Sequence, residues 1–349
     1  MRRRLPRRIL AAVIGGAMAI VGWTMSLLRF IGNSIIRPSI LKLSYAYLGL
    51  SGHRYRLVYE GSPDDLFIVT YPKSGTTWLQ MILYQLTTDG AMDFAHIDEI
   101  SPHLEETLVP TGRKISDLPG TPRVVKSHLA YRHIPRGPGR YIYCTRNGLD
   151  VAVSYFHQSR KWPPQNQVPM DEFFRRFMAG QVPYGSWFEH VAGWLRNEDR
   201  LDVLFVNYEE LSADLEAGVK RIAGFCGIAI DPAAMPRILE RCSFAFMREH
   251  DAQFAVERRM LPKSAPRPAD APPTFIRQGK VGGWRQELDA SAVAEFLREF
   301  DRWQRELGDD RFRILSGQGA PQGDGSASTP GRGPVGVADD HHRAPLRAG

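Results

Sequence analysis

Short β-rich runs that alternate with helical stretches constrain the fold of this chain more than any other feature. The β-rich runs cover residues 66–71, 123–126, 141–145 and 203–207. Helical stretches follow three of them, at residues 76–88, 149–161 and 215–226. This alternation predicts an α/β fold with a central parallel β-sheet flanked by helices on both faces. Ligands bind beyond the carboxyl ends of the strands in such sheets, so residues that follow a strand are candidate site residues.

The N-terminal end of the chain differs from the middle. Residues 1–8 form a basic N-terminus with five arginines, and residues 9–28 carry no charge. As a helix, that uncharged run would be about 30 Å long, the thickness of a bilayer's hydrocarbon core. We therefore expect residues 9–45 to anchor the protein in a membrane or to lie at its interface. A helix packed on the catalytic domain or on a partner subunit remains an alternative.

The C-terminal end differs from the middle as well. Residues 316–349 contain eight glycines and four prolines and almost no large apolar side chains. Such a segment cannot bury enough surface to offset its chain entropy, and this predicts a disordered tail. Residues 46–315 remain, enough for one sizeable core, and we expect them to form a single catalytic domain.

Charge and cysteine content narrow the class of function. Forty-five Lys and Arg against 38 Asp and Glu give a net charge of +7, which favours an anionic partner such as a nucleotide, a lipid or a nucleic acid. Nucleic acid is the weakest of these readings, because the excess arginine lies at the N-terminus beside an apolar run. Three scattered cysteines are too few for a disulfide framework or a zinc cluster.

The sharpest motif is Thr70-Tyr-Pro-Lys-Ser-Gly-Thr-Thr-Trp78, between the first predicted strand and its helix. A glycine permits a tight turn there, and backbone N–H groups at the helix start point at whatever occupies that position. A lysine adds a full positive charge and the hydroxyl side chains add donors. The anion-site residues are Lys73, Ser74, Gly75, Thr76 and Thr77. The lysine precedes the glycine, so the loop lacks the spacing of a nucleotide-binding P-loop.

This loop resembles the 5′-phosphosulfate loop of sulfotransferases that use 3′-phosphoadenosine 5′-phosphosulfate (PAPS). Three further motifs follow in the family's order through most of residues 60–290, and the similarity is closest to the cytosolic phenol- and steroid-type enzymes. The resemblance implies the sulfotransferase fold, which is related to that of P-loop nucleotide kinases. It also implies PAPS as the sulfuryl donor and no metal.

The second motif, Lys126-Ser-His-Leu129, resembles the family's K-T-H-L segment. Sulfuryl transfer to an alcohol needs a base for the hydroxyl proton, and an imidazole suits that task near neutral pH. The resemblance assigns this role to His128. Lys126 and Lys73 would neutralise charge on the transferring group and on the leaving phosphate.

The third motif, residues 144–156, resembles the family element that holds the 3′-phosphate. Arg146 follows a predicted strand, and Ser154 lies one or two turns into the next helix. A guanidinium makes paired hydrogen bonds to phosphate and a hydroxyl completes the set, although a salt bridge from Arg146 to Asp150 is an alternative. Gly-Leu at 148–149 replaces the family's Pro-Lys.

The fourth motif, residues 275–284, resembles the family's R-K-G-x-x-G-D-W segment, which reaches over the 3′-phosphate. Arg277 and Gly279 match this pattern. Gln278 stands where a basic residue is expected and Gly283 where an aspartate is usual, while Lys280 could supply part of the lost charge. These departures bear on cofactor affinity more than on the type of reaction.

Three aromatic residues match the family's adenine site. Tyr208 corresponds to a tyrosine at a strand end, and Trp78 and Phe244 would stack on the purine. Cys242-Ser-Phe aligns with a T-S-F segment, so Cys242 replaces a hydroxyl. Core packing is the alternative for each ring.

Together these features predict a PAPS-dependent sulfotransferase that acts on a hydroxyl of a small hydrophobic or lipid acceptor. A nucleotide kinase and a membrane-associated nucleotide-binding protein without turnover are the alternatives. We expect association with the membrane through residues 9–45 and a catalytic domain on the cytoplasmic side. The acceptor and the oligomeric state are left open by the sequence.

Overall fold

The computed structural model describes residues 59–88, 92–108, 112–161, 168–255 and 275–316. The predicted hydrophobic segment at 9–45 lies outside the described residues, and so does the predicted tail apart from Ser316. No helix in the described part of the chain is both long enough and apolar enough to cross a membrane.

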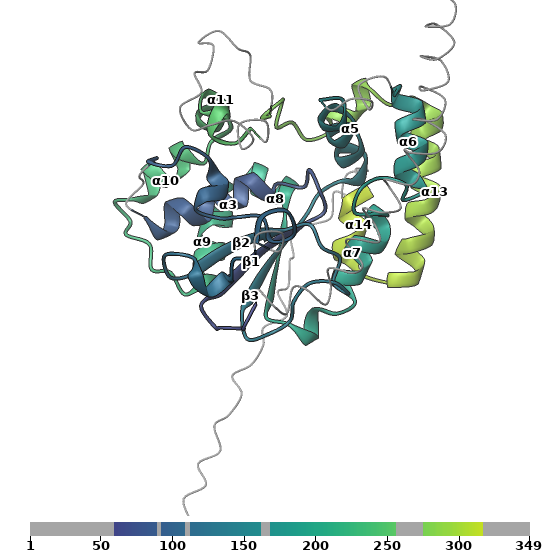
Figure 1. Cartoon of the computed structure of the whole chain (residues 1–349). Coiled ribbons are helices and arrows are strands. Elements are labelled where there is room, and N and C mark those ends of the chain that lie inside the picture. Colours follow the sequence, from purple (N-terminus) through teal and green to yellow (C-terminus); the bar gives the residue numbers. More distant parts are fainter. Residues whose placement is uncertain (1–58, 89–91, 109–111, 162–167, 256–274, 317–349) are drawn as a thin grey trace, which may run out of the picture. The chain divides into compact units, whose positions relative to one another are not determined.

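A four-stranded parallel sheet lies at the centre of the described fold (Figure 1). Its strands are β1 (Asp65–Thr70), β2 (Arg123–Ser127), β3 (Arg140–Thr145) and β4 (Val203–Asn207). They lie in the order β2-β1-β3-β4, and every neighbouring pair is parallel. The predicted parallel sheet is therefore confirmed, with strand ends within one residue of the predicted ones.

One face of the sheet is covered by the helix that follows β1 and by four helices that follow β4. These are α3 (Thr76–Thr87), α8 (Tyr208–Ala213), α9 (Leu215–Cys226), α10 (Met235–Arg241) and α11 (Phe244–Glu249). Leu66, Ile68 and Ile142 point to this face, where they pack with Leu83 of α3 and Ile222 of α9. The alternation of side chains along each strand sends every second apolar residue into this core.

The residues between them point to the opposite face. Phe67, Val69 and Tyr143 pack there with Trp194. The helices on this side and beyond it are α5 (Gly148–Ser159), α6 (Met170–Met178), α7 (Trp187–Leu195), α13 (Ala290–Leu307) and α14 (Asp310–Arg313) (Figure 1). Single helical turns are η2 (Ile97–Glu99), η3 (Leu104–Leu108), η4 (Ile115–Asp117), η6 (Glu198–Arg200), η7 (Asp251–Gln253), η8 (Gly283–Gln286) and η9 (Ile314–Ser316).

The helices that follow the strands begin at residues suited to a helix start. The Asn147 side chain accepts a hydrogen bond from the backbone N–H of Asp150 at the start of α5. Asn207 at the end of β4 caps α8 in the same way, because its side chain accepts a hydrogen bond from the backbone N–H of Glu210. Since Asn is favoured at the N-cap, the chain passes directly from strand to helix at the carboxyl edge of the sheet.

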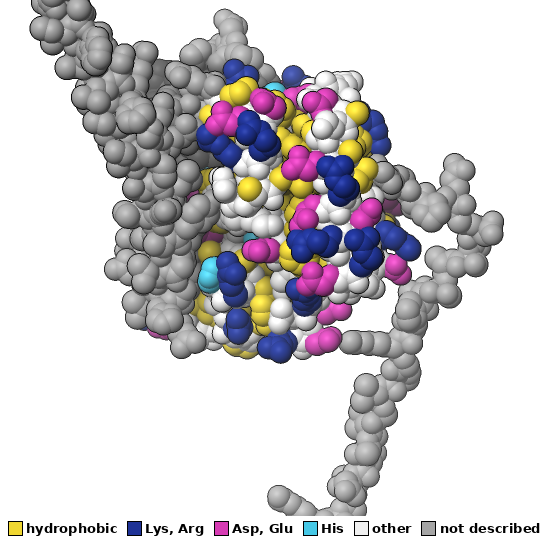
Figure 2. Space-filling view, turned by 90° about the vertical axis from the view of Figure 1, so that its right-hand side faces the viewer, with side chains coloured by type: hydrophobic (Ala, Val, Ile, Leu, Met, Phe, Trp, Pro, Cys, Tyr) yellow, Lys and Arg dark blue, Asp and Glu magenta, His cyan; other side chains and the backbone are white. Residues whose placement is uncertain are grey.

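Charges of both signs are interspersed on the face that carries α6 and α13, as Figure 2 shows. Part of this mixing comes from pairs one helical turn apart, Arg176 with Glu172 and Arg302 with Glu299. Because this face presents no block of one sign, it offers no extended surface for a polyanion.

Candidate active site

A cavity of about 430 Å³ opens at the carboxyl ends of the strands. It is lined by the loop after β1, by the ends of β2 and β3, by α5, α8 and α11, and by residues 275–283. Fourteen of the predicted site residues line it: Lys73, Gly75, Thr76, Thr77, Trp78, Lys126, His128, Arg146, Ser154, Tyr208, Phe244, Arg277, Gln278 and Gly279. Ser74 is the remaining one, and its side chain is buried beneath the loop.

The loop after β1 holds a strained backbone against the cavity. Gly75 has φ of 100°, and a Cβ at this position would lie 3.0 Å from Cδ2 of Tyr208. Lys73 also has a positive φ, of 70°, which is unusual for a residue with a side chain. No side chain caps the start of α3, and the Ser74 hydroxyl is buried without a hydrogen-bond partner in the described structure. The loop thus keeps hydrogen-bond donors for a ligand.

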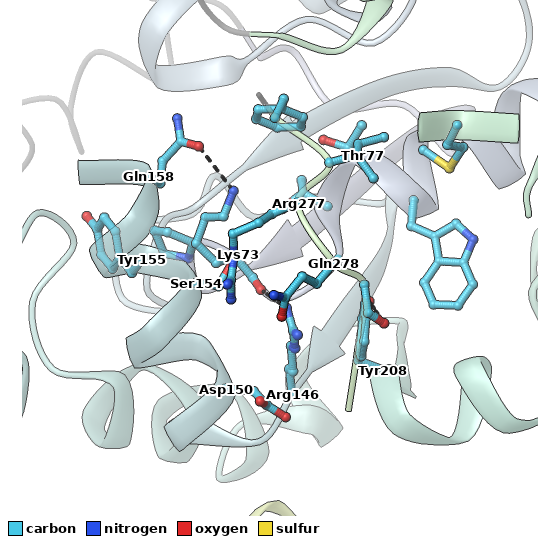
Figure 3. A pocket seen from close by; sticks show the side chains of 18 of the residues that line it. Lys73, Thr77, Arg146, Asp150, Ser154, Tyr155, Gln158, Tyr208, Arg277 and Gln278 are labelled. Atoms are coloured by element: carbon cyan, nitrogen blue, oxygen red, sulfur yellow. Dashed lines mark hydrogen bonds between the residues drawn. The ribbon is translucent and has the colours of Figure 1, made fainter. Parts of the chain in front are cut away.

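Lys73 extends along one wall of the cavity. Its Nζ donates a hydrogen bond to Oε1 of Gln158 over 3.4 Å, and it lies 4.7 Å from the ring centre of Phe275. Figure 3 shows the Lys73 side chain reaching toward Gln158, near Arg277. The positive charge is therefore positioned between α5 and the segment that begins at residue 275.

Arg146 is held at the floor of the cavity by backbone carbonyl groups. Nη1 donates to the carbonyl oxygen of Lys73 over 2.9 Å, and Nη2 donates to that of Lys280 over 3.3 Å. Its guanidinium lies 4.2 Å from the ring centre of Tyr208, and its buried Nε has no partner among the described residues. The carbonyl groups orient the guanidinium without neutralising its charge, which suits an anion.

The alternative salt bridge from Arg146 to Asp150 does not form in the described structure. The Asp150 carboxylate instead accepts hydrogen bonds from the backbone N–H groups of Gly282 and Trp284, at 2.7 and 3.1 Å. Asp150 therefore fixes the segment that covers the cavity to α5. Figure 3 shows Asp150 beside Arg146, with Ser154 farther along the same helix.

His128 is oriented by the end of β1. Its Nδ1 lies 3.0 Å from the carbonyl oxygen of Thr70 and 3.2 Å from the Thr70 hydroxyl oxygen. A carbonyl oxygen only accepts hydrogen bonds, so Nδ1 carries the proton and Nε2 keeps the lone pair. Burial lowers the pKa of His128 to about 4, so the imidazole is neutral at neutral pH and can accept a proton.

Glu105 is a buried neighbour of His128 that the sequence did not single out. Its Oε1 accepts a hydrogen bond from the backbone N–H of His128 over 2.6 Å. Burial raises the pKa of Glu105 to about 8. The carboxyl group thus fixes the backbone at the base while being largely protonated at neutral pH.

Lys126 lines the cavity, but its charge has a carboxylate partner. Nζ lies 2.6 Å from Oδ1 of Asp98, and both side chains are nearly buried. Burial would raise the pKa of Asp98, yet the Lys126 ammonium outweighs it and brings the pKa to about 2. Asp98 is a second residue that the sequence did not indicate, and it restrains the position of Lys126.

The segment from residue 275 closes one side of the cavity. Nη1 of Arg277 donates to Oε1 of Glu287 over 3.0 Å, and Oε2 of Glu287 lies 2.5 Å from Nε2 of His157. Gly279 has φ of 61°, and a Cβ there would lie 2.4 Å from Cδ2 of Phe244. This close approach explains why glycine occupies position 279. Gln278, which replaces the basic residue of the family pattern, is exposed to solvent.

Aromatic rings line the side of the cavity near α3 and α8. The Trp78 and Tyr208 rings meet edge to face, with centroids 5.3 Å apart. Nε1 of Trp78 donates to the carbonyl oxygen of Cys242 over 2.8 Å. Phe244 is among the exposed large apolar residues and also lines the cavity, so its ring is accessible to a ligand. Burial raises the pKa of the Cys242 thiol to about 12, which keeps it neutral.

Packing explains the departure from the family pattern at positions 148–149. A Cβ on Gly148 would lie 2.5 Å from Cζ of Phe296 on α13, so a larger residue does not fit there. Leu149 is fully buried, which suits an apolar side chain and would penalise a lysine.

The charge balance of the cavity favours anions. Its lining contains five basic side chains, those of Lys73, Lys126, Arg146, Arg277 and Lys280. It contains two acidic ones, those of Glu106 and Asp150. Within the described ranges, no group of three or more His, Cys, Asp or Glu residues could hold a metal ion.

Comparisons with known proteins agree on one family. The family model of the sulfotransferase domain matches residues 63–309. Rabbit (Oryctolagus cuniculus) sulfotransferase 1C2 is 34% identical over 244 residues, which cover 66% of this chain and 79% of the rabbit protein. Mouse (Mus musculus) sulfotransferase 1B1 is 33% identical over 250 residues, which cover 68% of this chain and 82% of the mouse protein.

A solved structure gives the same result. The crystal structure of mouse sulfotransferase SULT7A1 complexed with PAP (adenosine 3′,5′-bisphosphate) matches with a TM-score of 0.58 and 28% identity. The match covers 77% of this chain and 92% of the mouse chain. The family model spans nearly all of the described residues. The chain therefore belongs to the sulfotransferase family.

Proposed function

We propose that this sulfotransferase moves the sulfuryl group of PAPS to a hydroxyl group of a small hydrophobic acceptor. The observation that carries this proposal is the hydrogen bond from Nδ1 of His128 to the Thr70 carbonyl oxygen, at 3.0 Å. It leaves the lone pair on Nε2 of a neutral imidazole, in a cavity rich in basic side chains. A base beside an anion site is what sulfuryl transfer to a hydroxyl requires.

The described residues fit a nucleotide with two anionic ends. The uncapped start of α3, which lines the cavity, offers backbone donors at one end, and Arg146 with its partnerless Nε offers donors at the other. Aromatic rings of Trp78, Tyr208 and Phe244 would contact the purine. The cavity volume, about 430 Å³, falls within the usual range of small-molecule sites.

Each residue has a role in the proposed reaction. When bound, PAPS supplies the activated sulfuryl group. Nε2 of His128 would accept the proton of the acceptor hydroxyl as the hydroxyl oxygen bonds to the sulfur of PAPS. The bond from that sulfur to the 5′-phosphate oxygen would break, and adenosine 3′,5′-bisphosphate would leave. The Lys73 ammonium stabilises negative charge at the loop, and Lys126, held by Asp98, adds positive potential near the base. Ser154, Arg277, Gln278 and Gly279 would complete the contacts to the 3′-phosphate from α5 and from the covering segment.

Family membership decides against a nucleotide kinase. The other alternative, a membrane-associated protein that binds the nucleotide without turnover, is distinguished by the activity test below.

We also propose that residues 9–45 hold the catalytic domain at the cytoplasmic side of a membrane, which suits a lipid or other hydrophobic acceptor. This part rests on the sequence of residues 1–45 alone. We expect the full chain to float with anionic lipid vesicles, and a failure to float would contradict it.

The activity test compares the wild-type protein with His128→Asn, using PAPS labelled in its sulfuryl group and a panel of phenols and alcohols. Loss of a general base costs about 10²–10⁴ in rate, so we expect kcat/KM to fall by at least about 10²-fold. Binding of adenosine 3′,5′-bisphosphate to the variant should persist. Unchanged turnover in His128→Asn would contradict the role of the base, and binding without turnover in the wild-type protein would favour a binding protein.

A pH profile tests the same assignment. Because burial lowers the pKa of His128 from 6.5 to about 4, the imidazole stays unprotonated until the pH falls well below 6.5. We therefore expect kcat/KM to remain high through pH 6.5 and to decline only near pH 4. An acid limb centred at 6.5 would mean that His128 is solvated in the working enzyme.

A further inference from the structure

The buried carboxylate of Asp251 holds the start of the covering segment, residues 275–283. Asp251 begins the helical turn η7, is 2% exposed, and is not among the residues that line the cavity. Its Oδ1 accepts hydrogen bonds from two successive backbone N–H groups, those of Phe275 and Ile276, at 3.0 and 2.6 Å. Hydrogen bonds to a carboxylate are stronger than those to a neutral acceptor. One side chain thus fixes the first two residues of the segment.

The turn that carries Asp251 is itself attached to the core of the protein. The side-chain amide of Gln253 donates to the carbonyl oxygens of Met92 and Phe94, at 3.3 and 2.6 Å. The Phe254 ring is 1% exposed and belongs to the core that also contains residues of α3. Because the turn has bonds and packing of its own, Asp251 gives the covering segment a fixed point of attachment.

The ring of Phe275, the first residue that Asp251 holds, lies against the ammonium group of Lys73. Nζ of Lys73 is 4.7 Å from the ring centre, and it donates to Oε1 of Gln158 along the dashed line in Figure 3. Nζ of Lys161 lies 5.5 Å from the same ring centre. Since an aromatic face attracts cations within about 6 Å, the ring helps two positive charges to gather at this wall of the cavity.

We propose that Asp251 is a positioning residue for sulfuryl transfer, which acts through Phe275 to hold the Lys73 ammonium at the cavity wall. The inference rests on the proposed function, because in that reaction Lys73 would stabilise negative charge that develops on the leaving 5′-phosphate. Without the Asp251 carboxylate, the backbone at Phe275 loses its attachment and the ring loses its fixed position. The position of Lys73 is then less well defined, and this slows the transfer step.

The far end of the covering segment keeps its own attachment, because Asp150 accepts hydrogen bonds from the backbone N–H groups of Gly282 and Trp284. Arg146 also keeps its bond to the carbonyl oxygen of Lys73. Loss of the Asp251 contacts should therefore affect the transfer step more than nucleotide binding. This difference separates a positioning role from a general loss of structure.

Turnover of the full chain with labelled PAPS tests the inference. Asp251→Ala removes the acceptor of both N–H groups, and Phe275→Leu removes the ring. In each variant kcat should fall about tenfold, while the affinity for adenosine 3′,5′-bisphosphate stays close to the wild-type value. Asp251→Asn keeps an acceptor oxygen and Phe275→Tyr keeps the ring, so both should retain most of the wild-type kcat. Asp251→Ala/Phe275→Leu should be no slower than the slower single variant, because the two residues act through one contact.

Asp231→Ala is the matched control. Asp231 is exposed, it also accepts a hydrogen bond from a backbone N–H, that of Ala233 at 2.9 Å, and it does not line the cavity. This variant should keep the wild-type kcat.

The position of Lys73 gives a readout that does not depend on turnover. In protein whose lysines carry ¹³C-methyl groups, we expect the ring current of Phe275 to shift the NMR signal of Lys73 upfield. The signal is assigned with Lys73→Arg. It should move toward the signals of exposed lysines in Phe275→Leu and in Asp251→Ala, and it should stay in place in Asp251→Asn and in Asp231→Ala.

The outcomes separate this inference from the proposed function. If no acceptor is sulfated but Asp251→Ala abolishes the upfield shift, the proposed function fails and the positioning of Lys73 by Asp251 stands. The same kcat and the same shift in Asp251→Ala as in Asp231→Ala would overturn the inference. If Asp251→Ala does not fold, Phe275→Leu decides, since it leaves the Asp251 contacts to the backbone intact. An unchanged kcat and shift in Phe275→Leu would also overturn the inference.

Discussion

At the scale of single residues, burial sets the protonation of the groups around the base. It shifts the pKa of the imidazole and the pKa of the carboxyl group in opposite directions. It lowers the pKa of His128 to about 4 and raises that of Glu105 to about 8. Both effects favour the uncharged form, because charge is costly in a dry environment. A neutral imidazole and a largely protonated carboxyl therefore lie near each other, and a hydrogen bond of 2.6 Å joins the backbone N–H of His128 to Oε1 of Glu105.

Glu105 gives the protein a measurable dependence of stability on pH. Its pKa is raised in the fold, so the folded state binds more protons than the unfolded chain, and stability falls as the pH rises toward 8. One proton contributes at most about 1.4 kcal/mol per pH unit. We expect the free energy of unfolding to decrease between pH 6.5 and 8, a range above the ordinary pKa of histidine.

Urea unfolding of wild type and Glu105→Gln over this range checks the expectation. The glutamine keeps an acceptor oxygen for the His128 N–H but cannot titrate, so the decrease should shrink in the variant. Glu249→Gln serves as the control, since this side chain is exposed on α11. The same decrease in wild type and Glu105→Gln would show that another group is responsible.

At the scale of elements, the sequence predicted the strand–loop–helix units well, because each one is encoded locally. The glycine and hydroxyl residues after β1 and the caps at Asn147 and Asn207 fix where the strands end and the helices begin. Helical spacing could also have indicated Gln158, since Asp150, Ser154 and Gln158 recur at intervals of four and all line the cavity. From this face of α5, the sequence analysis identified Ser154 as a site residue but not Gln158.

Other site residues had no local signal. Asp98 pairs with Lys126 from η2, and Glu105 binds the His128 backbone from the π-helical turn η3. Both lie more than twenty positions from the motif that they support. Acidic residues in a connecting segment usually lie in solvent, so only the three-dimensional fold reveals that these two are buried at the base.

The contact between α5 and α13 gives a prediction at this scale. Gly148→Ala would place a methyl group 2.5 Å from Cζ of Phe296, and neither helix can yield without disturbing the Trp187 ring nearby. Overpacking of this kind costs about 1–3 kcal/mol. We expect a lower free energy of unfolding in urea and at least partial recovery in Gly148→Ala/Phe296→Leu. No loss of stability in Gly148→Ala would show that the packing adapts.

At the scale of the whole molecule, the function depends on segments that come together at one edge of the sheet. The loop after β1, the end of β2, the helix after β3, the start of α8 and residues 275–283 all line the same cavity. The parallel order of the strands makes this convergence predictable, because every carboxyl end lies at the same edge. The hydrogen bonds of Asp150 to Gly282 and Trp284 are what brings the last segment into place, and no rule of sequence spacing gives them.

The arrangement of the whole site also shows what the departure from the family pattern at Gln278 means for the proposed 3′-phosphate contacts. The neutral Gln278 lines the cavity at a solvent-exposed position, while two carbonyl groups hold Arg146. Arg277 shares Glu287 with His157. The contacts expected for the 3′-phosphate therefore depend on Arg146 more than on the covering segment.

Calorimetric titration of the full chain with adenosine 3′,5′-bisphosphate tests the central claim most directly. Adenosine 5′-monophosphate is the comparison ligand, and Arg146→Ala is measured beside Arg136→Ala, an exposed arginine outside the cavity. We predict micromolar binding that weakens at least about tenfold without the 3′-phosphate and in Arg146→Ala, and that persists in Arg136→Ala. Equal binding of the two nucleotides, or binding that survives Arg146→Ala, would contradict the account.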